Sequence, residues 1–499
     1  MDFAWGAHLP ILQVIVVLLA APLAFLTQRV RVAWLIAFIA SAIALWIASC
    51  LLIQVQQGGA IVYQLGGWAA PMGIGYHIDL LNAFMLVLVS AISTIALPYS
   101  LRSIEEELSA HSQPLFYVYW LLCVAGLLGI LATGDAFNVF VFLEISALST
   151  YALIALGSDR DGDRRALHAS LKYLLLGSIG ATFIVIGIGL LYMMTGTLNM
   201  MDLAARLPAV QDTRTVHAAF AFLVIGAGLK AAMFPLHTWL PDAYSHAPSA
   251  TSVLLAGTST KVAIYVMLRF LISVFGFEFS FIGIHVELWL LPLAVLAILY
   301  GSLRAVYQLD AKRLLAYSSV AQVGYIFLAI SIGSAAGIAA GLIHMFNHAL
   351  MKAALFMAIG AVVYRAGGSR LFHIAGFGRA MPWTFGAMLL GGMSLVGVPF
   401  TVGFISKWYL VTSSLDTYGL ALVVFVLASS LLAALYVWRL VDVAWFRPVM
   451  HERELKEAPL SMLLPMWVLV LANVYFAFDT DLTVGIAQRT AAVLLGGAQ

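Results

Sequence analysis

Charged residues are scarce in this sequence. Asp, Glu, Lys and Arg make up 10% of its 499 residues, whereas soluble domains contain about 25%. Hydrophobic residues account for 63% of the chain, and its mean hydropathy is +1.01. So little charge cannot cover the surface of a soluble protein of this size, and the composition therefore predicts a multi-pass membrane protein.

Cysteine is also scarce. The chain has two, Cys50 and Cys123, and both lie in apolar runs, where a thiol behaves as a small hydrophobic group. They provide neither a disulfide framework nor the spacing of a metal site. The sequence also lacks a Gly-rich phosphate loop, a CxxC pair and a haem signature. We therefore expect no metal site, no cofactor and no redox chemistry in this chain.

Basic residues are missing before the first apolar run. A secretory signal peptide begins with a positively charged segment, whereas no Lys or Arg precedes residue 9 here. We therefore expect the first run to be retained as a membrane span.

Long apolar runs fill the rest of the chain. About 20 apolar residues can cross a bilayer as a helix, and fourteen such runs predict an all-α integral membrane protein. The predicted spans cover approximately residues 9–26, 33–53, 77–100, 115–133, 136–157, 168–194, 215–239, 246–272, 285–303, 310–332, 337–365, 383–411, 418–446 and 460–478.

The basic residues predict how these spans are oriented, because cytoplasmic loops of membrane proteins are enriched in Lys and Arg. With both termini outside, only three basic residues fall in outer loops: Arg206, Arg214 and Arg489. The cytoplasmic loops then hold sixteen: Arg29, Arg31, Arg102, Arg160, Arg164, Arg165, Arg304, Lys312, Arg313, Arg365, Arg370, Arg379, Arg439, Arg447, Arg453 and Lys456. This asymmetry predicts that both termini face outward.

The most unusual stretch covers residues 226–261, GAGLKAAMFPLHTWLPDAYSHAPSATSVLLAGTSTK. An apolar helix carries Lys230, is interrupted near Pro235, and is followed by a second apolar helix that carries Lys261. A proline removes a backbone donor from a helix, and a lysine at the bilayer centre costs roughly 2.5 to 3.5 kcal/mol on insertion scales. One alternative is a merely kinked span whose lysines extend to the membrane surface. The combined cost favours a functional role.

The same combination occurs again in GGMSLVGVPFTVGFISKWYL, where Pro399 lies mid-span and Lys407 follows it. Paired interrupted spans are typical of transporters with internal repeats. Five spans separate the two, so the second unit would be inverted. We predict repeats made of spans 4–8 and 9–13, each containing a broken helix. The predicted divisions are an N-terminal three-helix segment (1–114), the first repeat (115–272), the inverted second repeat (285–446), and a C-terminal helix and tail (447–499).

Further ionisable residues lie inside predicted spans. Glu144 has no basic neighbour in sequence, so it is either a neutral buried acid or the partner of a lysine on another helix, for which Lys230 is the candidate. His344, His348 and Lys352 recur every four residues and therefore share one face of a helix. A single buried histidine is usually a core residue, but three titratable residues on one face indicate a function.

Such residues can carry protons. Burial disfavours the charged form of a lysine, whereas a nearby carboxylate favours it. Moving or screening that carboxylate would release the proton, and groups joined by water could pass it on. Aromatic and amide residues are not concentrated in one place, as they would be in a pocket for an organic solute. The pattern therefore predicts proton translocation within the membrane.

Several segments resemble the antiporter-like subunits shared by respiratory complex I, membrane-bound hydrogenases and Mrp-type multisubunit cation/proton antiporters. The resemblance covers about residues 77–446 and is strongest in LKAAMFPLHTWLPDAYSHAPSATSVLLAG, LDAKRLLAYSSVAQVGY, NHALMKAALF and GVPFTVGFISK. It implies half-channels around the two broken helices, at Pro235 and Pro399, and a hydrophilic axis along the membrane middle. The proton-translocating residues that it implies are Glu144, Lys230, Lys261, His344, His348, Lys352 and Lys407.

Within this family, STKVAIYVMLR and LLYMMTGTLNMMDLA are most similar to the D-type subunits of Mrp antiporters. Tyr244 stands where complex I relatives often have histidine, and Lys407 where some have glutamate. The resemblance implies a secondary transporter subunit, not an enzyme, in the bacterial inner (cytoplasmic) membrane. Its partners would be other membrane subunits, protons, monovalent cations such as Na⁺, and the lipid bilayer, with no nucleic acid.

Two alternatives remain at this point. The chain could be a proton-pumping subunit of a redox complex, such as complex I or a membrane-bound hydrogenase, in which other subunits handle the electrons. It could also be a structural scaffold, which the buried lysines disfavour because each one is costly in lipid.

Overall fold

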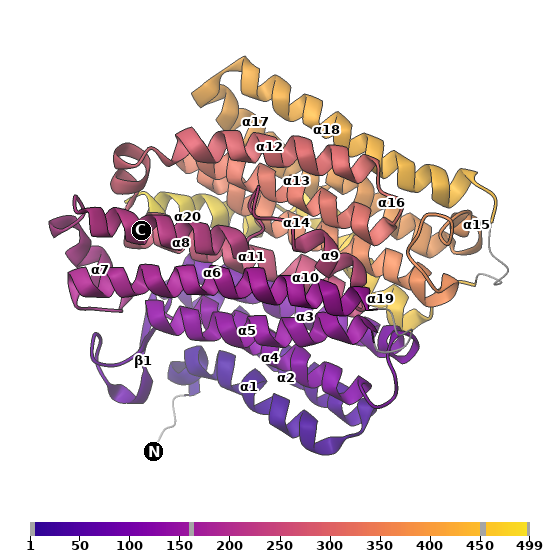
Figure 1. Cartoon of the computed structure of the whole chain (residues 1–499), viewed down its shortest axis with the longest axis horizontal. Helices are drawn as coiled ribbons and strands as arrows, with labels where there is room; N and C mark the ends of the chain where they lie inside the picture. Colours follow the sequence, from indigo (N-terminus) through magenta and orange to yellow (C-terminus); the bar gives the residue numbers. More distant parts are fainter. Residues whose placement is uncertain (1–4, 159–163, 450–455, 497–499) are drawn as a thin grey trace.

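The computed structural model describes residues 5–158, 164–449 and 456–496, which are almost entirely helical (Figure 1). Arg160 and Arg453, two basic residues of the predicted cytoplasmic loops, lie outside the described residues. Twelve described segments are long and apolar enough to cross a membrane. They contain α1 (Leu9–Thr27), α2 (Val30–Gly58), α3 (Leu80–Glu107), α4 (Gln113–Ala132), α5 (Ala136–Ala155), α6 (Arg165–Thr195), α10 (Ser249–Gly257) with α11 (Ser259–Leu268), α12 (Val286–Val306), α13 (Ala311–Ser331), α14 (Ala335–Ala366), α18 (Leu420–Val441) and α19 (Leu460–Phe478).

The two remaining predicted spans are each interrupted. In the seventh, predicted at 215–239, α8 (Arg214–Lys230) ends early and non-helical chain follows, and the short helix α9 (Leu240–His246) begins just after the predicted end. The twelfth consists of α16 (Pro382–Val396) and α17 (Val402–Tyr418). The twelve long segments and these two broken spans account for the fourteen predicted spans.

The predicted prolines lie in the gaps between these half-helices. Pro235 falls in the non-helical stretch after α8, and Pro399 in the stretch after α16. Each gap also contains a residue other than glycine with a positive φ, Ala232 at 56° and Phe400 at 68°. A right-handed helix cannot continue through such a residue. The two predicted breaks are therefore confirmed.

The eighth span contains a further break that no proline signals. Between α10 and α11, Thr258 has φ −126° and ψ −62°, far from helical values. The chain then continues helically, and α11 is followed by a π-helical segment, Arg269–Val274. This break matters because Lys261 lies directly after it.

Several short elements lie at the two ends of the helix bundle (Figure 1). One end carries a hairpin in which Ile61 pairs with Ile78, together with two short helices. These elements are β1 (Ile61–Gln64), antiparallel β2 (Gly75–Ile78), α7 (Met200–Arg206) and α20 (Ile486–Leu494). The other end carries α15 (Phe377–Ala380). The hairpin is a small exception to the predicted all-helical fold.

The most buried helices lie where the two predicted repeats meet. The apolar part of α13 is 100% buried, and those of α14 and the α10–α11 span are 94% buried, against 33% for α18. α10, from the first predicted repeat, packs on α14, from the second. Successive helices also pack in the same order in both units, α4, α5, α6 and α8 in one and α12, α13, α14 and α16 in the other. The domain boundaries themselves stay a prediction.

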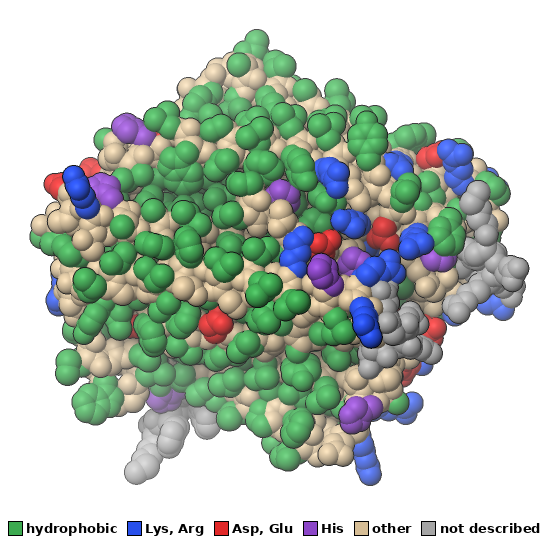
Figure 2. All heavy atoms as spheres, in the orientation of Figure 1, with side chains coloured by type: hydrophobic (Ala, Val, Ile, Leu, Met, Phe, Trp, Pro, Cys, Tyr) green, Lys and Arg blue, Asp and Glu red, His purple; other side chains and the backbone are tan. Residues whose placement is uncertain are grey.

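The outer surface of the bundle is hydrophobic. Figure 2 shows hydrophobic side chains over most of one face, with charged groups gathered mainly toward one end. Exposed side chains include Leu171 and Leu175 on α6 and Leu431 and Trp438 on α18. Such a continuous apolar surface is stable in lipid and would be a liability in water. The chain is thus a multi-pass membrane protein.

Replacing Gly403 with alanine should destabilise the junction of α16 and α17. An added Cβ would collide with the backbone carbonyl of Ser394, and overpacking of this kind costs about 1–3 kcal/mol. At Gly386 on α16, an added Cβ would meet only the Trp467 ring at an ordinary 3.5 Å. We expect Gly403→Ala to lower the melting temperature of the detergent-solubilised protein and Gly386→Ala, inside a helix and without a clash, to leave it unchanged or raise it slightly. Equal melting temperatures would contradict this account of the junction.

Candidate functional site

Glu144 on α5 and Lys230 on α8 form an ion pair inside the bundle. Lys230 Nζ lies 3.8 Å from Glu144 Oε1, and neither atom has a hydrogen-bond partner among the described residues. The Lys230 side chain is 6% exposed and that of Glu144 is 27% exposed. The predicted pairing is therefore present, as an electrostatic contact without a hydrogen bond.

A small cavity adjoins Lys230 on the side of span eight. Its volume is about 30 Å³, and its wall includes Ser146, Tyr173, Lys230 and Ser259. A cavity of about 10–15 Å³ or more can hold a water molecule if polar groups face it. The Ser259 hydroxyl is buried and, like Lys230 Nζ, has no hydrogen-bond partner among the described residues. The cavity therefore has the room and the polar groups for a bridging water.

Lys261 lies beyond this cavity, next to the break in span eight. Its side chain is 1% exposed. The amine donates a hydrogen bond to the carbonyl of Ala256, in the last turn of α10, and a longer one of 3.4 Å to Thr260 Oγ1. The break thus gives the buried amine a backbone acceptor instead of a carboxylate.

The two histidines of α14 lie side by side in the core. His344 Nδ1 is 2.9 Å from Ser406 Oγ, and its Nε2 is 3.0 Å from Gln322 Oε1. The rings of His344 and His348 are parallel, with centroids 6.2 Å apart. Neither ring nitrogen of His348 has a hydrogen-bond partner among the described residues. Lys261 interacts electrostatically with both rings, so span eight and α14 contribute to one cluster.

Lys352 completes the predicted α14 face. It is fully buried, and its amine donates hydrogen bonds to the Leu315 carbonyl at 2.9 Å and to the Ser318 hydroxyl of α13. It also interacts electrostatically with Lys261. All three α14 residues therefore face the same interior region.

Lys407 lies at the junction of α16 and α17. Its amine donates to the carbonyls of Val396 at 2.7 Å and Leu395 at 3.3 Å, and to Ser430 Oγ at 3.0 Å. The amine also lies 5.0 Å from the centre of the Tyr325 ring. The broken helix therefore ends with its last carbonyls directed at the lysine that follows the break.

Two of the four lysines share this geometry, since the Lys261 amine binds the end of α10 and the Lys407 amine binds the end of α16. Lys230 also lies at a helix break, as the last residue of α8, but its amine has no hydrogen-bond partner among the described residues. The last carbonyls of a helix have no intrahelical partners, and they carry a partial negative charge that stabilises cations. The breaks before Lys261 and Lys407 therefore each supply part of the site for that lysine.

The sequence did not single out the uncharged polar groups that lie beside these residues. They are Gln322, Ser406, Ser318, Ser430 and Ser259. A signal was present, since all of them interrupt apolar spans, but serine occurs in many spans without a function. Within the described residues, no group of three His, Cys, Asp or Glu residues could hold a metal ion.

Comparisons with known proteins show the family of the chain. Residues 133–433 match the family model described as NADH:quinone oxidoreductase/Mrp antiporter, TM. The chain is 40% identical to the N-type subunit of NADH-quinone oxidoreductase from Desulforudis audaxviator, over 93% of this chain and 94% of that protein. It is 32% identical to the D-type subunit of a Na⁺/H⁺ antiporter from Alkalihalophilus pseudofirmus, over 86% and 85%.

Solved structures also match. A chain of the Mrp complex from Dietzia sp. superposes with a TM-score of 0.88 at 25% identity, covering 99% of this chain and 98% of that one. The sequence, the fold and the family match lead to one conclusion: this chain belongs to the NADH:quinone oxidoreductase/Mrp antiporter transmembrane family.

Proposed function

We propose that this chain is the proton-translocating membrane subunit of a multisubunit antiporter that exchanges a monovalent cation, such as Na⁺, for protons. The observation that carries the proposal is the set of ionisable groups, all buried except the partly exposed Glu144, that lie from Glu144 to Lys407 with hydroxyl, amide and carbonyl groups beside them; we call this set the row. Buried charge is costly in a membrane and typically marks an ion or proton path. The chain performs no enzymatic reaction in this proposal and needs no cofactor.

In this proposal the Glu144 and Lys230 pair determines when Lys230 holds its proton and when it releases it. At 3.8 Å, the carboxylate stabilises the charged amine, and this attraction weakens as the two atoms separate. Because no hydrogen bond fixes the pair among the described residues, a small movement of α5 against α8 changes the proton affinity of Lys230. A cation or a partner subunit that draws Glu144 away would therefore make Lys230 release its proton.

The released proton then moves toward span eight and α14. A water in the cavity between Lys230 and Ser259 would link the first pair to the break before Lys261. His348 follows, and its two unengaged ring nitrogens suit it to take a proton on one side and return it on the other.

His344 continues the row toward Lys407. Ser406 and Gln322 hold its ring, and Ser406 is the residue directly before Lys407 on α17. Lys407 is the last ionisable group of the row, and Tyr325 and Ser430 lie against its amine.

The orientation and partners in this proposal come from the sequence and the relatives. The excess of basic residues in one set of loops supports a position in the bacterial cytoplasmic membrane with both termini outside. The matched Na⁺/H⁺ antiporter protein is named as a subunit, and the matched structure is a complex. We therefore propose other membrane subunits as the partners of this chain.

A second candidate is a proton-pumping subunit of a redox complex. The observation that favours it is the 40% identity to a protein named as an NADH-quinone oxidoreductase subunit. In that case the same row would move protons, and other subunits would carry the electrons. The two candidates differ in partners and driving force and share the proposed proton path.

Glu144→Gln should reduce cation-dependent proton exchange by at least about tenfold, because it removes the charge that sets the proton affinity of Lys230. Exchange is measured as the recovery of a pH-sensitive dye when Na⁺ is added to everted membrane vesicles that contain the complex. Glu287→Gln is the matched control, since Glu287 is similarly half-buried and pairs with His285 at 3.1 Å outside the row. Full exchange by an assembled Glu144→Gln complex would refute the proposed pair.

Lys407→Arg tests whether this lysine must release its proton. Arginine keeps the positive charge but is not deprotonated in proteins, so we expect an assembled complex whose exchange falls by at least about tenfold. Lys312→Arg is the control, because Lys312 is also buried and also donates to a backbone carbonyl, that of Ala247 at 3.2 Å. If Lys407→Arg transports normally, the residue acts only as a fixed charge.

Purification of the complex from native membranes separates the two candidate functions. For the antiporter, we expect mass spectrometry to identify only membrane subunits with this chain, and metal analysis to find negligible iron. Iron–sulfur or quinone-reducing subunits that co-purify in stoichiometric amounts would instead establish the redox complex.

A further inference from the structure

A second line of buried polar residues leaves the row at Lys261. Lys261, Tyr265 and Arg269 recur every four residues, so they lie on one face of α11 and its π-helical extension. Tyr265 is 2% exposed and Arg269 is 7% exposed. The line leads away from the cluster on α14 toward the end of the bundle that carries β2.

Arg269 connects this line to the start of α3. Its Nη2 donates to Asp79 Oδ1 at 2.5 Å, and its Nε donates to the Tyr265 hydroxyl at 3.0 Å. The Tyr265 hydroxyl in turn donates to the Leu131 carbonyl at 3.2 Å. The guanidinium also lies 5.1 Å from the centre of the Tyr265 ring. These contacts form one continuous polar chain from Tyr265 to Asp79.

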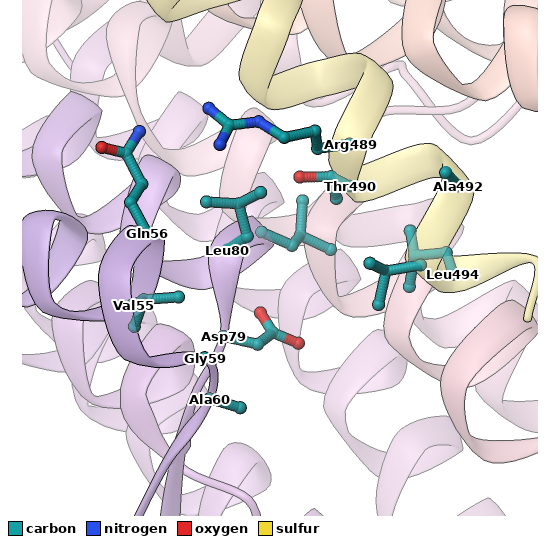
Figure 3. Close-up of a pocket in the computed structure, with 12 residues that line it drawn as sticks. Val55, Gln56, Gly59, Ala60, Asp79, Leu80, Arg489, Thr490, Ala492 and Leu494 are labelled. Carbon is teal, nitrogen blue, oxygen red and sulfur yellow. The ribbon is translucent and has the colours of Figure 1, made fainter. Parts of the chain in front are cut away.

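Asp79 is also part of the wall of a large cavity. The cavity has a volume of about 360 Å³ and lies between the end of α2, the start of α3 and α20 (Figure 3). Gln56, Asp79, Arg489 and Thr490 contribute polar groups to its wall. The Thr490 hydroxyl is buried and has no hydrogen-bond partner among the described residues. The rest of the wall is mostly apolar, including Val55, Leu80 and Leu494, so the polar groups form one side of a largely apolar cavity that has room for water.

The ion pair with Arg269 holds the Asp79 carboxyl in its charged form. Burial alone would raise the pKa of its carboxyl, but the Arg269 guanidinium outweighs burial and holds that pKa below its ordinary value. The carboxylate is therefore charged and neutralised by Arg269 at neutral pH. It accepts a proton only when the guanidinium moves away.

We infer that the cavity of Figure 3 is the outer mouth of the proton row and that the Asp79–Arg269 pair is its gate. This inference rests on the proposed function and adds a route along span eight, apart from the half-channels expected at the broken helices. A proton leaves the Lys261 ammonium, which becomes a neutral amine, and water carries it to Tyr265, because the amine itself donates to Ala256 and Thr260. The Tyr265 oxygen takes it up and releases the hydroxyl's own proton through water to the Asp79 carboxylate when Arg269 is displaced, and the acid then gives a proton to water in the cavity. Arg269 keeps its charge throughout.

A purely structural role is the competing explanation for Asp79. Its carboxylate caps α3 by accepting a hydrogen bond from the Asn82 backbone amide at 3.1 Å. The ion pair with Arg269 could serve only to fix this helix start. The tests therefore block the cavity and the hydroxyl and leave Asp79 itself intact.

The first test blocks the cavity from outside. Ala492→Cys places a thiol on the cavity wall, and Met72→Cys places one in the hairpin loop, at a residue that is 87% exposed and outside the cavity wall. Both complexes, in right-side-out vesicles, are treated with a charged, membrane-impermeant thiol reagent. We expect both to be labelled and only Ala492→Cys to lose cation-dependent proton exchange, by roughly tenfold. Failure to label Ala492→Cys, or labelling without inhibition, overturns the inference.

The second test removes one hydroxyl from the line. Tyr265→Phe keeps the ring and the ion pair, so we expect an assembled complex whose exchange is roughly tenfold slower. Tyr117→Phe is the control, because Tyr117 is equally buried and its hydroxyl contacts Ser100 at 3.3 Å away from the row. Normal exchange in Tyr265→Phe also overturns the inference.

These outcomes are separate from those of the proposed function. If Glu144→Gln abolishes exchange while Ala492→Cys and Tyr265→Phe leave it unchanged, the row stands and its outer mouth lies elsewhere. If Glu144→Gln transports normally, the proposed function fails whatever the result at the cavity.

Discussion

The arrangement of this site depends on hydrogen bonds from buried lysine amines to the carbonyls at the ends of interrupted helices. A carboxylate would hold each amine permanently charged, whereas a carbonyl accepts a hydrogen bond from either the ammonium or the neutral amine. Lys261 and Lys407 bind such carbonyls, so each can lose its proton and still keep a partner. Of these three lysines, Lys230 is the one with a carboxylate nearby among the described residues, and that contact is long enough to be broken by a small displacement.

This arrangement requires that the breaks be held in place by their surroundings. Backbone groups exposed within hydrocarbon each cost several kcal/mol unless protein covers them. The breaks are accordingly packed against the most buried helices, with α10 and both halves of the twelfth span in contact with α14. Gly403 shows how closely the half-helices approach, since no side chain fits between it and α16. Rigid packing and local backbone irregularity thus occur in the same place.

The sequence predicted well the features whose residues are energetically costly in lipid, and poorly the features that carry no such cost. Fourteen spans, the breaks at Pro235 and Pro399, and the closeness of Glu144 to Lys230 follow from residues whose cost in lipid demands an explanation. The break at Thr258 carries no proline, and the hairpin of β1 and β2 is short, so neither leaves a clear pattern. Adjacency of distant helices, such as α10 with α14, depends on tertiary packing that periodicity does not encode. The proton roles of these residues stay a prediction.

The size of the cavity beside Lys230 bears on what could cross this segment. Its volume of about 30 Å³ exceeds the roughly 10–15 Å³ that a water molecule needs when polar groups face it, and it is small beside a sodium ion that carries several waters. Under the proposed function, a proton would hop across on the water held there, whereas a hydrated metal ion would need another route.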